Sequence, residues 1–129
     1  ATGMFCRQLD LVPPSDPRMP EGAQALKMRP ISVNNPAYYY VYYGTLALYQ
    51  HQGPVWGDWN DRLKETLPRL QNKNGSDAGS WDKGAGHAAS GGRVVSTTLA
   101  TLSLEVYYRL LPMYGFRNKE AAPPPKQKL

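Results

Sequence analysis

The sequence predicts an all-α fold made of antiparallel helical hairpins, and three observations lead to this prediction. A long apolar stretch, residues 38–49, follows an Asn-Pro pair that is typical of a helix start. A stretch that is apolar on one side only follows, between residues 56 and 70. A second, nearly all-apolar stretch covers residues 94–111 after a long polar loop. The order of buried helix, surface helix and buried helix predicts a hairpin array.

The chain begins with short helices that are separated by prolines. Residues 1–11 have the pattern of the end of a helix, which stops at Pro13-Pro14. Proline cannot continue a helix and pushes the preceding residue to extended backbone. A second short helix is predicted from Pro20 to Met28, and Pro30 closes it.

The tyrosine-rich stretch 38–49 is the first predicted buried helix. A strand is the competing prediction, because Tyr and Val favour sheets. The length of the stretch, the start at Asn35-Pro36 and the sequence Leu46-Ala47-Leu48 favour a helix. Since it is apolar or aromatic on every face, we expect it to be buried all round. Gly53-Pro54 is expected to end it.

The next helix is predicted to turn its polar side to water. Its apolar residues recur at spacings of three and four: Trp56, Trp59, Leu63, Leu67 and Leu70. Charged residues fill the opposite side. Pro68 is expected to kink or end this helix.

A loop and a second buried helix complete the predicted fold. Residues 71–92 are rich in Asn, Gly, Ser, Asp and Ala and predict a loop. The second buried helix is expected from Val94 to Leu111, with Glu105 and Arg109 as a favourable i, i+4 pair. The sequence predicts one repeat domain, residues 1–116, and a disordered, basic, Pro-rich tail, residues 117–129.

Composition excludes several classes of protein. The net charge is +5, and residues 117–129 carry +3 of it, so no basic surface for nucleic acid is predicted on the domain. The single cysteine, Cys6, allows no intramolecular disulfide and is expected to be a small buried residue. No run of about 18 apolar residues predicts a transmembrane helix. The sequence does not predict a cellular compartment, because the start at Ala1 without Met indicates a cut or processed chain.

Two features of the sequence resemble known helical-repeat proteins. Residues 44–48, Gly-Thr-Leu-Ala-Leu, are similar to residues 97–102, which gives a period of roughly 50 residues. The second feature resembles the QW motif of squalene–hopene cyclases, with these residues in the motif positions: Lys64, Leu67, Gln71, Gly79 and Trp81. The motif's Gly after the basic residue is missing here, and the spacer before Gly79 is longer.

Residues 38–112 also resemble squalene-cyclase-like proteins of planctomycete bacteria, most clearly in Gly91-Gly92-Arg93 and in residues 103–109. The resemblance implies an arc of an α/α-toroid, the fold shared with protein prenyltransferase β subunits and complement thioester domains. It also implies that the Gln of the motif caps a helix end and stacks on the Trp. A full toroid needs about six hairpins, and a chain of this length supplies two to three. We therefore expect the C-terminal part of a larger protein.

The candidate chemistry is weak. Cyclases of this class start from an acidic Asp-rich motif that protonates an alkene, and no Asp-x-Asp-Asp occurs here. Asp58 and Asp61 lie on the polar side of their helix and are expected to be solvated. Asp77, Asp82 and His87 share a loop but give little support for a metal site. No catalytic residue, metal or cofactor is predicted.

Two further groups of residues have open interpretations. Aromatic residues of the first buried helix could line a cavity that stabilises carbocations, or could form an aromatic core: Tyr39, Tyr42, Tyr43 and Tyr49. The backbone at Gly91-Gly92-Arg93 could hold an anion. The alternative is that Arg93 bonds to carbonyl groups or to an acidic neighbour.

Three functions follow as hypotheses. The preferred one is a non-catalytic toroid repeat module that binds a protein partner, another helical-repeat subunit or the rest of its own parent chain. The second is part of a squalene/hopene-cyclase-like isomerase, a terpene cyclase whose acid lies upstream. The third is a module that binds an isoprenoid or another lipid through its aromatic wall.

Overall fold

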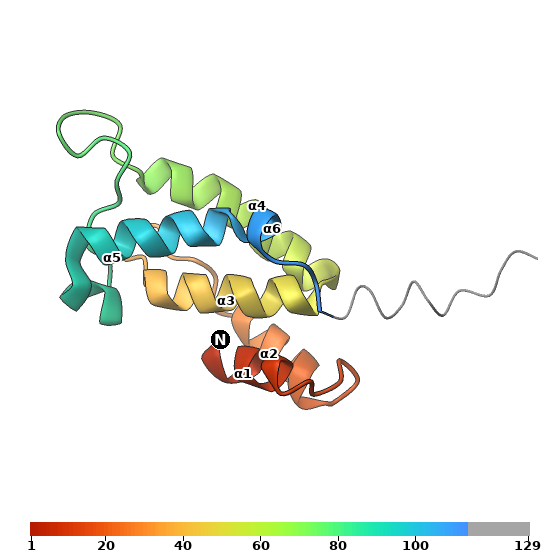
Figure 1. Ribbon diagram of the computed structural model, residues 1–129. Coiled ribbons are helices and arrows are strands. Elements are labelled where there is room, and N and C mark those ends of the chain that lie inside the picture. Colours follow the sequence, from red (N-terminus) through yellow and green to blue (C-terminus); the bar gives the residue numbers. More distant parts are fainter. Residues whose placement is uncertain (114–129) are drawn as a thin grey trace, which may run out of the picture.

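The structure is a computed structural model that describes residues 1–113. These residues form six helices (Figure 1): α1 (Thr2–Leu9), α2 (Arg18–Lys27), α3 (Tyr38–His51), α4 (Gly53–Leu70), α5 (His87–Leu104) and α6 (Val106–Arg109). Within residues 1–113 there is no strand, only an isolated antiparallel bridge between Gln71 and Trp81. The predicted all-α fold is therefore confirmed. The end of the predicted domain at 116 and the predicted tail lie outside the described residues.

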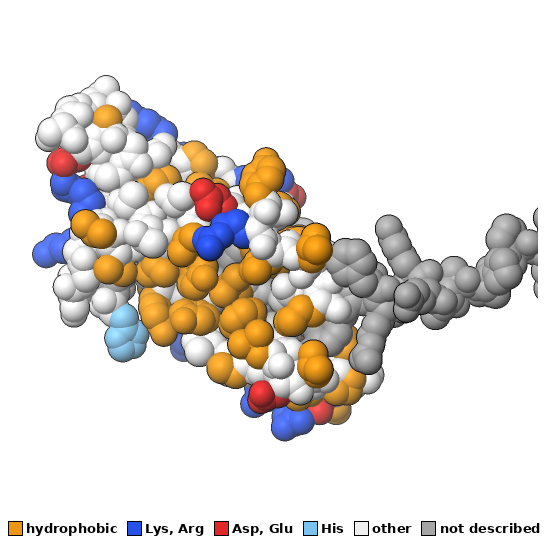
Figure 2. Space-filling view, viewed as in Figure 1, with side chains coloured by type: hydrophobic (Ala, Val, Ile, Leu, Met, Phe, Trp, Pro, Cys, Tyr) orange, Lys and Arg blue, Asp and Glu red, His pale blue; other side chains and the backbone are white. Residues whose placement is uncertain are grey.

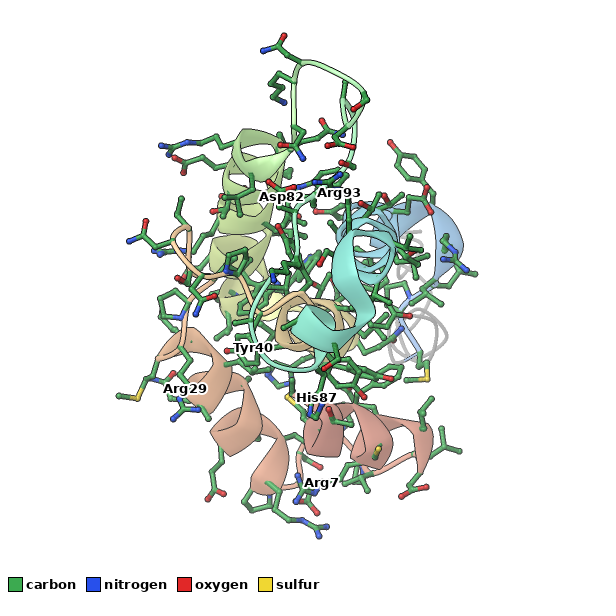
Figure 3. The ribbon with its side chains drawn as sticks, turned by 90° about the vertical axis from the view of Figure 1, so that its left-hand side faces the viewer. Arg7, Arg29, Tyr40, Asp82, His87 and Arg93 are labelled. Atoms are coloured by element: carbon green, nitrogen blue, oxygen red, sulfur yellow. The ribbon has the colours of Figure 1, made fainter. Side chains whose placement is uncertain are left out.

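The five longer helices form two layers. Viewed along the helices, α1, α3 and α5 make one layer, and α2 and α4 make the other (Figure 3). We call them the inner and the outer layer. Helix α3 is central, since it contacts α1, α2, α4 and α5, and its most extensive contact is with α5. The chain thus alternates between the two layers from α1 to α5.

The centre of the core is the second half of α3, where every residue from 44 to 50 is buried. Gly44 is needed there, because a Cβ at this position would lie 2.8 Å from the ring of Trp59 on α4. The indole nitrogen of Trp59 donates a hydrogen bond to Thr45 Oγ1 at 3.0 Å, so its polar end is satisfied in the core. Ala47 and Ala100, which match in the proposed repeat, are both fully buried.

The prediction that α3 is buried all round is wrong for its first half. Tyr39 is 38% exposed, and Tyr40, Tyr42 and Tyr43 are half-buried. The reason is that α3 belongs to the inner layer, whose outer surface no further helix of residues 1–113 covers. The start is also later than predicted, because Asn35 and Pro36 precede the N-cap Ala37.

Helix α4 matches its predicted pattern. Its buried residues include Trp56, Trp59, Leu63 and Leu67, all on the side that faces α3. The prediction that Pro68 kinks or ends the helix is only partly right, since Pro68 lies inside the helix and the end follows at Leu70. Proline has no N–H to donate to the carbonyl oxygen of Lys64, four residues earlier, and the helix continues for only two more residues.

The second buried helix differs from its prediction at both ends. Helix α5 begins at His87, inside the predicted loop, and its backbone is non-helical at Gly92, with φ 65° and ψ −158°. It ends at Leu104, because Glu105 leaves helical geometry and α6 starts in a new direction. Glycine tolerates the positive φ at 92, so it allows the bend.

Cys6 is exposed, contrary to the prediction that it is buried. The buried side of α1 carries Met4 and Gln8, which lie one turn apart, and Cys6 lies on another face. Gln8 Nε2 donates a hydrogen bond to the carbonyl oxygen of Ala47 at 2.9 Å, which joins α1 to α3. A polar residue thus occupies a core position that the sequence pattern would assign to an apolar one.

Candidate functional site

The QW-like segment forms a clasp between the end of α4 and α5. Trp81 is 4% exposed, and its indole Nε1 donates a hydrogen bond to the carbonyl oxygen of Leu67 at 2.7 Å. Gln71, the C-cap of α4, has extended backbone, so the Leu67 carbonyl is one of the helix-end acceptors without an intrahelical donor. The indole therefore satisfies a buried helix end.

Gln71 has a different role from the one that the resemblance implies. Its side-chain Nε2 donates to the carbonyl oxygen of Gly79 at 2.9 Å, within the loop. Backbone bonds between Asn72, Gly79 and Ser80 hold the two arms of the loop together. The amide thus shapes the loop, while Trp81 reaches the helix end. The two side chains have different roles because of the path of the chain. At Gln71 the backbone leaves α4 in an extended conformation, and the loop then returns to place the indole of Trp81 against the last turn of the helix.

The basic residue of the motif, Lys64, lies outside the clasp. Its side chain is exposed and forms an ion pair with Asp61 at 3.2 Å, one turn earlier on α4. Leu67 contributes through its carbonyl group and a fully buried side chain. Of the five predicted motif residues, the structure brings four together and leaves Lys64 on the polar side of α4.

Two hydroxyl groups of α5 fix the other end of the clasp. Thr97 Oγ1 accepts the backbone N–H of Trp81 at 3.0 Å, and Ser96 Oγ accepts that of Gly84 at 3.2 Å. A Cβ at Gly84 would lie 2.1 Å from the carbonyl oxygen of Pro36, so this position requires glycine. Sequence reasoning missed these residues, since hydroxyl and glycine positions in an irregular segment carry no periodic signal.

The carboxylates of the loop bind Arg93, as one of the two interpretations of that residue predicts. Its guanidinium lies 2.5 Å from Asp77 and 2.9 Å from Asp82 (Figure 3). Hydrogen bonds from Asn72 and from Arg93 lower the pKa of Asp82. His87 instead contacts the ring of Tyr39, with centroids 5.4 Å apart. Across residues 1–113, no three His, Cys, Asp or Glu side chains form a metal-binding group.

Aromatic rings gather on the open side of the inner layer. Ring contacts link Tyr39 to Tyr43 at 4.7 Å, Tyr42 to Tyr43 at 5.2 Å and Phe5 to Tyr43 at 6.3 Å. We call this cluster the aromatic face: Phe5, Tyr39, Tyr42, Tyr43 and His87. A hydrogen bond with Tyr39 raises the pKa of the Tyr43 phenol. Three predicted cavity residues thus lie together, at a surface rather than in a closed cavity.

Tyr49, the fourth predicted cavity residue, belongs to the core. It is 7% exposed and makes edge-to-face contacts with Trp56 at 5.3 Å and Tyr107 at 5.9 Å. Its hydroxyl donates to the carbonyl oxygen of Leu110 at 2.8 Å. Burial raises the pKa of this phenol. The two interpretations of the tyrosines therefore divide along α3, with core at its end and open surface at its start.

Apolar side chains continue the open surface beyond the aromatic face. Figure 2 shows hydrophobic side chains gathered across the face formed by α1, α3 and α5. The large exposed ones in these three helices are Leu9, Tyr39, Val94 and Val95. A small cavity of about 100 Å³ opens between α3 and the α5–α6 region, lined by Tyr42, Leu46, Leu102 and Val106 among others. Contiguous exposed apolar side chains are typical of an interaction site.

The outer layer carries charge instead. Asp58 pairs with Lys27 at 3.1 Å, and Asp61 pairs with Lys64, as expected for carboxylates on the polar side of α4.

No helix within residues 1–113 combines the length and the apolar character that crossing a bilayer requires. Comparison of the chain with models of protein families, with curated proteins and with solved structures finds no match.

Proposed function

We propose that this chain is a non-catalytic helical-repeat module of the α/α-toroid type, which binds another helical surface. That surface belongs to a protein partner, to another helical-repeat subunit or to the rest of its own parent chain. The observation that carries the proposal is the aromatic face, which leaves Tyr39 38% exposed on an apolar layer of three helices. The alternation of the chain between two layers supports the toroid type.

The composition of the aromatic face suits a protein surface. Tyrosine offers a large apolar area with a polar tip and few rotatable bonds, and it is enriched where proteins bind each other. Helices pack through ridges and grooves of side chains, and α1, α3 and α5 lie side by side in one layer, which suits packing against a further helix. Repeat proteins bury each unit against the next, so an uncovered layer indicates a neighbour.

The carboxyl groups favour a module without catalysis. An acid that protonates an alkene must be held protonated, which needs a raised pKa. A hydrogen bond from Arg18 lowers the pKa of Asp16 to about 2, and the pKa of Asp82 is lowered too. Asp58 and Asp61 lie in exposed ion pairs on the outer layer. None of these four groups has the environment of such an acid.

A terpene-cyclase-like enzyme remains the second candidate, since the clasp around Trp81 and the tyrosine rings of the inner layer fit that family. In such an enzyme, the rings would stabilise carbocations through their negative faces. A third candidate is a module whose aromatic face binds a lipid without converting it. Incubation of the chain with squalene, followed by analysis for cyclic products, distinguishes these candidates. Cyclic product would rule out the non-catalytic module, and bound but unchanged squalene would favour the lipid-binding variant.

Photo-crosslinking tests the proposed module directly. A benzophenone amino acid replaces Tyr39 in the aromatic face, and the protein is expressed in its own host. We expect crosslinks to one defined protein segment with helical periodicity, found by mass spectrometry. The control carries the same amino acid in place of Lys73, an exposed residue of the loop. Equal crosslinking from both positions, or none from position 39, would contradict the proposal.

A further inference from the structure

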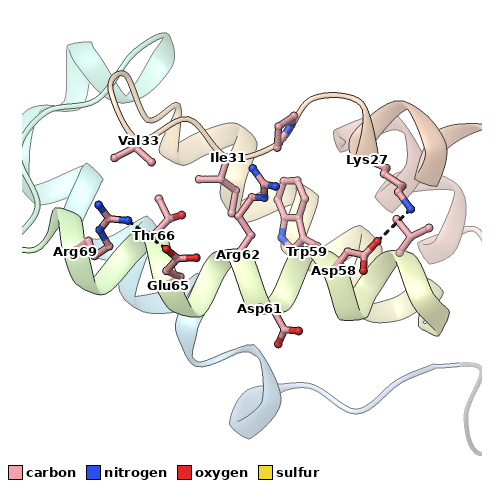
Figure 4. Close-up of a pocket in the computed structure, with 12 residues that line it drawn as sticks. Lys27, Ile31, Val33, Asp58, Trp59, Asp61, Arg62, Glu65, Thr66 and Arg69 are labelled. Atoms are coloured by element: carbon pink, nitrogen blue, oxygen red, sulfur yellow. Dashed lines mark hydrogen bonds and ion pairs between the residues drawn. The ribbon is translucent and has the colours of Figure 1, made fainter.

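A groove crosses the outer layer, on the side opposite the aromatic face. It lies between α4 and the segment that joins α2 to α3 (Figure 4), and its volume is about 600 Å³. On α4 it extends from Val55 to Arg69, which corresponds to about 21 Å at 1.5 Å per residue. A groove of this length fits about six residues of extended peptide.

The walls of the groove combine apolar side chains with paired charges. Pro30, Val33 and Val55 supply apolar surface, while Ile31 and Trp59, each 4% exposed, lie buried beneath it. The carboxylates that line it are already paired: Asp58 with Lys27, Asp61 with Lys64, and Glu65 with Arg69. These pairs leave little net charge at the two ends of the groove.

Arg62 is the exception among the charged residues of the groove. Its side chain rises from α4 toward the α2–α3 segment, midway along the groove (Figure 4). Within residues 1–113 its guanidinium forms no ion pair and no hydrogen bond. The groove therefore presents one cation without an ion-pair partner, with a planar set of donors that suits a carboxylate.

The α2–α3 segment adds unused backbone groups. Residues 30–32 are neither helix nor turn, and Ile31 and Val33 both line the groove. In the described part of the chain, the backbone amide and carbonyl groups of Ile31 and Val33 have no hydrogen-bond partner. Val33, which is 43% exposed, can offer these groups to the backbone of an added peptide, whereas Ile31 is buried.

We propose that this groove binds an extended peptide segment that carries one acidic side chain between apolar ones. The acidic side chain pairs with Arg62 at the centre. Flanking apolar side chains lie on Pro30, Val33 and Val55, and the peptide backbone bonds to the free backbone groups of Val33. This surface is independent of the aromatic face, so the two proposals stand or fall separately.

The test uses a capped heptapeptide, Ser-Val-Leu-Glu-Leu-Val-Ser, and its counterpart with Gln at the centre. Binding is followed by NMR through the backbone amides of Ile31 and Val33 and the indole of Trp59. We expect the Glu peptide to shift these signals and to bind about tenfold more tightly than the Gln peptide, because a charge-assisted bond is lost with Gln.

Substitutions of Arg62 identify the cation. Arg62→Ala should weaken the Glu peptide about tenfold and make both peptides bind alike, while Arg62→Glu should prefer a Lys-centred peptide. Arg7→Ala, which removes a half-buried arginine of α1 away from the groove (Figure 3), should leave the affinity for both peptides unchanged. Because Arg62 is exposed, its variants should keep the wild-type melting temperature.

Several results would overturn the proposal. The groove signals could stay unshifted with the Glu peptide, or the Gln peptide could bind the wild-type protein equally well. An unchanged affinity in Arg62→Ala would show that another group binds the acid. If sodium acetate at the peptide's concentration displaced the peptide and produced the same shifts, the site would bind a bare anion rather than a peptide segment.

Discussion

Replacement of Trp81 tests the clasp most directly. The side chain is 4% exposed, and an aromatic of this size buries about 150–250 Å². At about 25 cal/mol per Å², this area corresponds to about 4–6 kcal/mol for the whole side chain. Because alanine keeps the buried Cβ, Trp81→Ala should lower the free energy of unfolding by about 3–5 kcal/mol. For a chain of 129 residues, this corresponds to roughly 10–20 °C in the melting temperature.

Two further variants separate the indole hydrogen bond from the packing. Trp81→Phe keeps most of the ring but leaves the buried carbonyl of Leu67 without its donor, which should cost about 1–3 kcal/mol. Gln71→Ala removes only the exposed bond to Gly79 and should cost less than about 1 kcal/mol.

Thermal unfolding followed by circular dichroism measures all three variants. We expect the largest loss of stability for Trp81→Ala, a smaller one for Trp81→Phe and the smallest for Gln71→Ala. An unchanged melting curve for Trp81→Ala would show that the indole does not join the hairpins. A loss for Gln71→Ala as large as that for Trp81→Ala would show that the amide, rather than the indole, supports the end of α4.

Three other predictions concern separate parts of the molecule. Gly44→Ala should cost about 1–3 kcal/mol of stability in urea unfolding, because the new Cβ meets the ring of Trp59, whereas Gly57→Ala, which meets nothing within 4 Å, should not be destabilising. The pKa of Asp82 is lower in the folded state than the ordinary carboxyl pKa of 3.8. The ionised Asp82 carboxylate therefore stabilises the fold fully above pH 3.8, and this contribution is lost as the pH falls through the lowered pKa. The gap in melting temperature between wild type and Asp82→Asn should therefore narrow below about pH 4, and a gap that does not change with pH would contradict this. Cys6 should react with a thiol reagent in the folded protein at close to its rate in denaturant, because it is exposed, and strong protection would refute the exposure.

The amphipathic pattern made α4 the most accurately predicted element. Trp56, Trp59, Leu63 and Leu67 recur at helical spacing, and all four are buried in the structure. Such a pattern is reliable because a helix with one apolar side has only one way to bury it. The alternation of helix types along the chain likewise led to the all-α fold.

The ends of helices were less predictable. Gly92 lies inside α5 rather than before it, and α5 ends at Leu104, seven residues before the predicted end at Leu111. Backbone geometry at these positions depends on how neighbouring segments pack, and propensity has little weight against packing.

The sequence by itself determined which segments become helices and where aromatic residues are concentrated, because both follow from local pattern. Tertiary structure decided which of those aromatics are buried. Tyr49 enters the core beside Trp56, while Tyr39, on the same helix, stays at an uncovered layer. Tertiary structure also left the guanidinium of Arg62 without a partner and brought the indole of Trp81 to the carbonyl oxygen of Leu67. Each depends on distances between segments far apart in the chain, and no local pattern encodes those distances.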